Sequence, residues 1–204
     1  DRAGEMYERA LEFDPENADH TGNYALFLTN QRKDYDRAEA MYERALELDP
    51  EDADNTGNYG LFLTNQRKDY DRAEAMFERA LELDPENADH TGNYAVFLTN
   101  QRKDYDRAEA MFERALALDP ENAHHTGNYA VFLCDQRKNQ EKAEAMYDQA
   151  LKLDPEHPNN TGNFSGFLFA NGETDRAMSL LEKAFELAKP PEEYQDLILE
   201  LLFY

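Results

Sequence analysis

An eight-residue motif recurs along this chain at a constant interval, and this regularity limits the chain to one kind of architecture. The motif Thr-Gly-Asn-Tyr-Ala-Leu-Phe-Leu spans Thr21 to Leu28, and close copies begin at Thr56, Thr91 and Thr126, with a looser copy at Thr161. Successive copies start 35 residues apart, and the residues between them repeat as well. Such a chain builds a linear array of one small unit rather than a globule around a single site.

The repeat divides the chain into units of nearly constant length. Residues 1–15 match the second half of a unit, and full units are expected at about 18–50, 53–85, 88–120, 123–155 and 158–190. Residues 191–204 form a short amphipathic pattern, for which a capping helix is favoured over a dimerisation or partner helix. Because the chain starts inside a unit and without Met, we expect it to be a fragment of a longer protein.

Composition and charge narrow the classes of partner. The chain has 204 residues, a hydrophobic content of 41% and a formal net charge of −23. This charge repels nucleic-acid phosphates and anionic membranes, and it favours basic partners or simple solubility. The single cysteine excludes an internal disulfide and indicates a reducing compartment, and no apolar run reaches the length of a membrane span. The sequence therefore predicts a cytoplasmic protein with no membrane contact.

Each full unit carries two helical patterns. In the first, from about Asp19 to Arg32, Thr21, Tyr24 and Leu28 fall on one face that we expect to be core, while the opposite face is polar. The second pattern begins after Asp34, a good N-cap, and stops at Asp49-Pro50.

These residues resemble the tetratricopeptide repeat. The small Ala25 and Ala38, the large Tyr42 and the terminal Pro50 match that family's helix-packing pattern, and the match recurs in phase through the chain. The resemblance implies an all-α fold, a right-handed superhelical solenoid of antiparallel helix hairpins, that acts as a protein-interaction scaffold. The usual unit has 34 residues, so we expect the extra residue in the turn at Gln31–Asp34.

Two related families are also similar. The Tyr-Ala-x-Phe and Tyr-Glu-Arg-Ala-Leu segments resemble the half-a-tetratricopeptide repeats of RNA-processing scaffolds, but the chain has no tryptophan and has Leu28 at that family's glutamate site. Pentatricopeptide repeats share the 35-residue length and bind RNA, but the Leu-Asp-Pro ending and the acidity argue against them.

No constellation of residues indicates catalysis. The chain lacks a Gly-rich phosphate loop, a Cys-x-x-Cys motif and a His-Glu-x-x-His motif, so we expect no catalytic residues, no cofactor and no metal. The five histidines all stand at the start of a unit, where we expect surface substitutions for Asp and Asn. Cys134 replaces a threonine and is expected to be inert.

The candidate functional feature is a column of asparagines that we call the asparagine ladder, namely Asn23, Asn58, Asn93, Asn128 and Asn163. A primary amide can pair with both groups of a peptide backbone. Neighbouring first helices should lie about 10 Å apart, close to three residues of extended chain at roughly 3.3 Å each. Asparagines at matching places line the groove in O-GlcNAc transferases and other tetratricopeptide scaffolds, so the resemblance implies the same concave groove here.

Other residues of the same face would add specificity. Asn30, Asn65 and Asn100 would extend the amide row, and Gly22 and its equivalents would leave room for a ligand backbone. Apolar side chains would select ligand residues and carboxylates would favour Lys or Arg, at positions Leu26, Leu61, Val96, Val131, Asp19, Asp54 and Asp89.

The sequence thus predicts a non-enzymatic scaffold that binds an extended, basic peptide. In the competing interpretation, the asparagines bond neighbouring helices and only hold the array together. Two further alternatives are a structural protein that associates end to end and an RNA-processing scaffold of the half-repeat kind.

Overall fold

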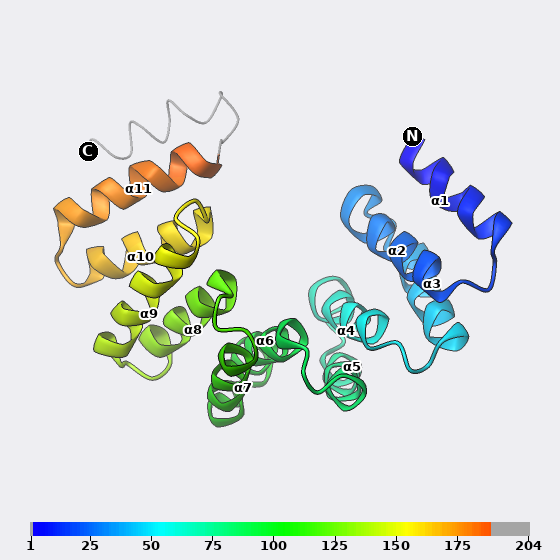
Figure 1. Cartoon of the computed structure of the whole chain (residues 1–204), viewed down its shortest axis with the longest axis horizontal. Coiled ribbons are helices and arrows are strands. Elements are labelled where there is room, and N and C mark those ends of the chain that lie inside the picture. The colour runs from blue at the N-terminus through cyan, green and yellow to red at the C-terminus, as the bar shows by residue number, and fades with distance from the viewer. Residues whose placement is uncertain (1, 189–204) are drawn as a thin grey trace. The chain divides into compact units, whose positions relative to one another are not determined.

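The computed structural model describes residues 2–188, and every regular element in that range is a helix. These residues form two compact units, 2–114 and 115–188, with the boundary inside helix α7 (Tyr105–Leu118). The first unit begins with α1 (Arg2–Phe13), and the remaining helices pair into hairpins, as the sequence predicts (Figure 1). The expected capping helix at 191–204 lies outside the described residues.

The hairpins of the first unit repeat one plan. A first helix of ten residues continues into a five-residue π-helical segment, and a second helix of 14 residues follows. The first helices are α2 (Ala18–Phe27), α4 (Ala53–Phe62) and α6 (Ala88–Phe97), the π-helical segments are η1 (Leu28–Arg32), η2 (Leu63–Arg67) and η3 (Leu98–Arg102), and the second helices are α3 (Tyr35–Leu48), α5 (Tyr70–Leu83) and α7.

The second unit keeps the hairpins without an assigned π-helical segment. Its helices are α8 (Ala123–Asp135), α9 (Gln140–Leu153), α10 (Pro158–Ala170) and α11 (Thr174–Ala188). The two helices of a hairpin pack on each other in the pairs α2–α3 and α4–α5 of the first unit and α8–α9 and α10–α11 of the second.

Alternating small and large side chains explain the packing of each hairpin. Ala25 and Ala38 are fully buried and let the paired helices approach closely, while Tyr24, Leu28 and Tyr42 fill the space around them. Aromatic rings then stack across successive hairpins, as in the Tyr42–Tyr59 pair with ring centroids 5.4 Å apart and the Tyr147–Phe164 pair at 5.1 Å. The predicted core face is confirmed.

The thirty-fifth residue of the unit is absorbed at the end of the first helix. Lys33 adopts a left-handed conformation with φ 57°, and the Asp34 amide donates to the Leu28 carbonyl at 3.1 Å, six residues back. The widened segment Leu28–Arg32 begins three residues before the expected location at Gln31–Asp34 and overlaps it, so the extra residue is accommodated in the last turn of the helix as well as in the turn that follows. In the last hairpin the same contact spans only five residues, from Glu173 to Leu168, and Gly172 takes the left-handed position.

Candidate functional site: the asparagine face of the first helices

N-terminal caps fix where each first helix begins and therefore where its asparagine lies. The side chain of Asn17 accepts a hydrogen bond from the His20 amide at 2.8 Å, and Asp52 accepts from the Asn55 amide at the same distance. The helix then places the ladder asparagine six residues after each cap, as in Asn23 of α2. In the first unit α2 packs against α4, and in the second α8 packs against α10, so ladder positions on neighbouring first helices follow one another within each unit.

The ladder amides are accessible to solvent. Asn23 and Asn163 are exposed, and Asn58, Asn93 and Asn128 are partly exposed. Within residues 2–188 the side chains of Asn23, Asn58 and Asn93 form no hydrogen bond. The Asn128 amide lies 3.1 Å from Nε2 of His124, one turn earlier on the same helix. The interhelix bonds of the competing interpretation are therefore absent from the described part of the ladder.

The other residues of the proposed face are also accessible. Leu26 is 39% exposed, and Leu61, Val96 and Val131 are partly exposed. The second amide row, Asn30, Asn65 and Asn100, is exposed, as are the carboxylates of Asp19, Asp54 and Asp89. Asp54 is engaged by its neighbour, since its Oδ1 lies 3.1 Å from Nε2 of His90.

At three glycines of the motif, Gly22, Gly57 and Gly127, the structure does not leave the space for a ligand that the sequence suggested. A Cβ added to Gly22 would lie 1.7 Å from Oδ1 of Asn55, and one added to Gly57 would lie 2.5 Å from the His90 ring. The space beside each glycine is thus filled by a side chain of the next first helix. In the second unit Asn160 fills the space beside Gly127 in the same way.

Asn55, His90 and Asn160, which we call the interlock residues, join successive first helices. Each is buried, and each bonds to the preceding hairpin. Nδ2 of Asn160 donates to the Ala123 carbonyl at 2.8 Å, and Nδ2 of Asn55 donates to the Ala18 carbonyl at 3.4 Å and to Asp52 at 2.6 Å. These polar groups satisfy their hydrogen bonds inside the array, in contrast to the ladder amides.

The histidine prediction was wrong for two of the five residues. His90 is 7% exposed and His125 is 2% exposed, so neither is a surface substitution. A signal for this role exists in the sequence, because the position before each motif threonine is always His or Asn. Both side chains can donate and accept hydrogen bonds.

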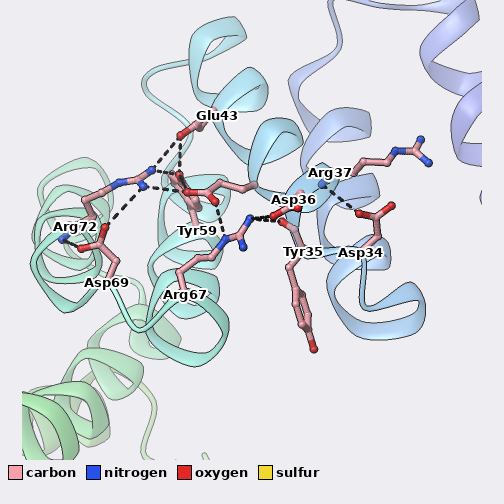
Figure 2. A network of polar contacts seen from close by, with 10 residues as sticks. Asp34, Tyr35, Asp36, Arg37, Glu43, Tyr59, Arg67, Asp69 and Arg72 are labelled. Atoms are coloured by element: carbon pink, nitrogen blue, oxygen red, sulfur yellow. Dashed lines mark hydrogen bonds and ion pairs between the residues drawn. The ribbon is translucent and has the colours of Figure 1, made fainter.

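A second network of polar contacts, shown in Figure 2, ties α3 to the next hairpin. Arg67, at the end of η2, reaches Glu39 at 2.6 Å, Asp36 at 2.7 Å and the Tyr35 carbonyl at 3.0 Å. Arg72 of α5 reaches the same Glu39 at 2.9 Å, as well as Glu43 and the Tyr59 hydroxyl.

The network recurs one hairpin later. There Arg102 and Arg107 hold Glu74, and Arg107 also contacts Glu78 and Tyr94. The sequence pattern alone does not mark these arginines as interface residues, because their partners lie about one unit away along the chain.

Burial governs the titration of the tyrosines in this network. It raises the pKa of Tyr59 and Tyr94 far above the usual value for tyrosine. At Tyr59 the nearby Arg72 opposes this rise, and the hydrogen bond to Glu43 adds to it. Both phenols therefore remain protonated donors in the interface at physiological pH.

Residues 2–188 contain no cluster of His, Cys, Asp and Glu side chains that could hold a metal ion. In the same range no helix is both long and apolar enough to cross a membrane.

Solved structures with the same fold come from several kinds of protein. The type IV pilus biogenesis factor PilW has a TM-score of 0.79 and 21% identity, covering 97% of this chain and 90% of its own. Yeast Tom70 has a TM-score of 0.78 and 21% identity, covering 98% of this chain but only 42% of its own. YrrB, described as a TPR protein with an unusual peptide-binding site, has a TM-score of 0.61 and 23% identity, covering 98% of this chain and all of its own.

Family comparison gives the assignment. No curated protein sequence matches the chain. Sequence models of the tetratricopeptide repeat, however, match overlapping segments along its length, at residues 1–53, 31–88, 65–123, 100–158 and 136–201. The fold class and the resemblance inferred from the sequence are confirmed, and the chain belongs to the tetratricopeptide repeat family.

Proposed function

We propose that the first-helix face binds an extended peptide, with the ladder amides pairing with its backbone. The observation that supports this most directly is the state of Asn23, Asn58 and Asn93, whose side chains reach solvent and form no hydrogen bond within residues 2–188. The interlock residues nearby all have hydrogen-bond partners within the array. One column of polar side chains thus joins the hairpins, whereas the asparagine ladder does not. An amide with open donors and an open acceptor suits a peptide backbone.

Neighbouring side chains would give the site its preferences. Leu26 lies three residues after Asn23 and Asp19 lies four residues before it, so all three share a helix face. A partly exposed apolar residue beside each amide can contact an apolar ligand side chain, and the aspartates favour Lys or Arg. The proposed ligand is therefore an extended segment with basic and apolar residues.

The test is a peptide-display selection on the purified chain, followed by titration of an enriched peptide. In the double variant Asn58→Ala/Asn93→Ala, each lost amide removes hydrogen bonds of about 0.5–1.5 kcal/mol each. The dissociation constant should rise by about tenfold or more, since 1.4 kcal/mol corresponds to a factor of ten.

The matched control is Arg44→Ala/Glu47→Ala, which removes an exposed ion pair on α3 and leaves the net charge unchanged. It should bind as the parent does. Equal affinity in the ladder variant and the parent would reject the amide clamp. Selection of no peptide at all, together with a salt-sensitive shift of RNA, would instead assign the chain to the RNA-scaffold class.

A further inference from the structure

The two inner interfaces of the first unit each enclose a glutamate between two arginines of the next hairpin. Glu39 accepts from Nε of Arg67 at 2.6 Å and from Arg72 at 2.9 Å, and it is only one-fifth exposed. Glu74 forms the corresponding ion pairs, 2.6 Å from Nε of Arg102 and 3.0 Å from the following arginine, with nearly the same exposure. The geometry of this carboxylate site is thus reproduced from one interface to the next.

The first interface lacks this glutamate. Helix α1 reads Ala-Gly-Glu-Met-Tyr-Glu where α3 reads Ala-Glu-Ala-Met-Tyr-Glu, so Gly4 stands where Glu39 would be. The two arginines remain, as Arg32 and Arg37. Arg37 keeps the contacts that do not involve this position, with Glu8 at 3.2 Å and the Tyr24 hydroxyl.

A pocket of about 480 Å³ lies at this place. Gly4 is part of its wall, both arginine side chains line it, and its apolar floor includes Phe27 and Leu28. A terminal nitrogen of Arg32 lies 3.1 Å from the position that a Cβ on Gly4 would take. The pocket therefore presents guanidinium groups at the point where the inner interfaces hold a carboxylate.

We propose that this pocket, which we call the Gly4 pocket, binds the side-chain carboxylate of a glutamate from an acidic peptide. The incoming carboxylate would take the place of Glu39, bridging Arg32 and Arg37 from the solvent side. Other contacts of these arginines do not prevent this. At the inner interface one guanidinium, that of Arg67, binds two carboxylates and a carbonyl at once.

The described carboxylates differ between the two sites. The inner cluster combines its two arginines with the carboxylates of Asp36, Glu39, Glu43 and Asp69. Around the Gly4 pocket the described carboxylates are Glu5, Glu8 and Asp34. The site is independent of the asparagine ladder, because none of the ladder residues lines it.

The experiment follows the arginine Nε–H signals of the isotope-labelled chain by NMR during titration with a capped single glutamate, N-acetyl-glutamate methylamide. The capped glutamine, which has the same shape without the charge, is the control ligand. We expect a saturable shift of the Arg32 and Arg37 signals with glutamate and no saturable shift with glutamine.

Two variants at one position give the matched comparison. Gly4→Glu supplies the carboxylate from within and should abolish the shift, whereas Gly4→Ala adds only a methyl group and should retain it. Arg32→Gln should also abolish it, and Glu5→Gln should strengthen binding by removing a repelling carboxylate. An equal response to both ligands, or an unchanged response in Gly4→Glu, would overturn the proposal.

Discussion

Replacing Gly57 by alanine should destabilise the first unit, although alanine is the better helix former. The new Cβ would lie 2.5 Å from the His90 ring, whereas comfortable carbon contacts are about 3.5–4.0 Å. The ring is buried and held by Asp54, so overpacking should cost about 1–3 kcal/mol, and a weakened hydrogen bond about 1 kcal/mol more. The higher helix propensity of alanine should offset about 1 kcal/mol of this loss. The net loss should therefore be about 1–3 kcal/mol.

The equivalent glycine of the last described hairpin provides the control. Among residues 2–188, a Cβ on Gly162 would meet only the Cβ of Ala184, at 3.9 Å, which is an ordinary contact. Gly162→Ala should therefore stabilise its hairpin by up to about 1 kcal/mol. The two substitutions are chemically identical and should have effects of opposite sign.

Hydrogen exchange measures both effects locally, which matters because repeat arrays do not always unfold in one step. Amides of α4 should lose protection in Gly57→Ala, and amides of α10 should gain it in Gly162→Ala. In a His90→Ala background the Gly57→Ala change should no longer destabilise, since the clashing ring is gone. If Gly57→Ala stabilises the chain, or still destabilises it without the ring, the interlock is not the reason for this glycine.

Three further predictions follow from single sites. Gly60→Ala should stabilise the chain by about 1 kcal/mol in thermal unfolding, because alanine already occupies the same buried position in other hairpins, as at Ala25. The nearest atoms would lie 3.3 Å from the new Cβ, so a destabilised variant would show that these neighbours cannot adjust. Arg67→Met should cost about 1–2 kcal/mol in urea unfolding, because the largely buried Glu39 then keeps only one of its two arginines, Arg72. Arg44→Met removes an exposed pair and should cost less than about 0.5 kcal/mol. Burial, aided by Asp135, raises the pKa of the Cys134 thiol, so its alkylation at mildly alkaline pH should be slower than that of a free thiol, and a rate equal to that of glutathione would contradict this.

The fold follows from the sequence because its signals are local and repeated. A period of 35 residues, an N-cap such as Asp34 and a core face such as Tyr24 and Leu28 all act within one helix or one hairpin. The same pattern also recurs in every copy of the motif, so a substitution in one copy does not hide the helices that the other copies indicate.

The contacts between hairpins could not be predicted in the same way. His90 fills the space beside Gly57 from 33 residues away, and this depends on how closely two first helices approach. The sequence shows both residues but not the distance between them. From the sequence alone, the glycine therefore suggests space for a ligand and the histidine suggests a surface position. The role of Arg67 could not be predicted for the same reason, since its partners Asp36 and Glu39 lie about 30 residues earlier in the chain.

The binding role of the asparagine ladder remains a proposal, because repetition preserves residues for assembly and for binding alike. The accessible amides of Asn58 and Asn93 support the binding role.

The way each first helix ends also affects how an array of this kind can change in evolution. Four successive ends place lysine in the left-handed conformation and return the chain after six residues, whereas Gly172 does so after five. In both forms the next helix starts from the same hydrogen bond to a leucine carbonyl. A one-residue insertion or deletion here is therefore absorbed within a single helix end, and units of different length can be joined in one chain without shifting the hairpins out of phase.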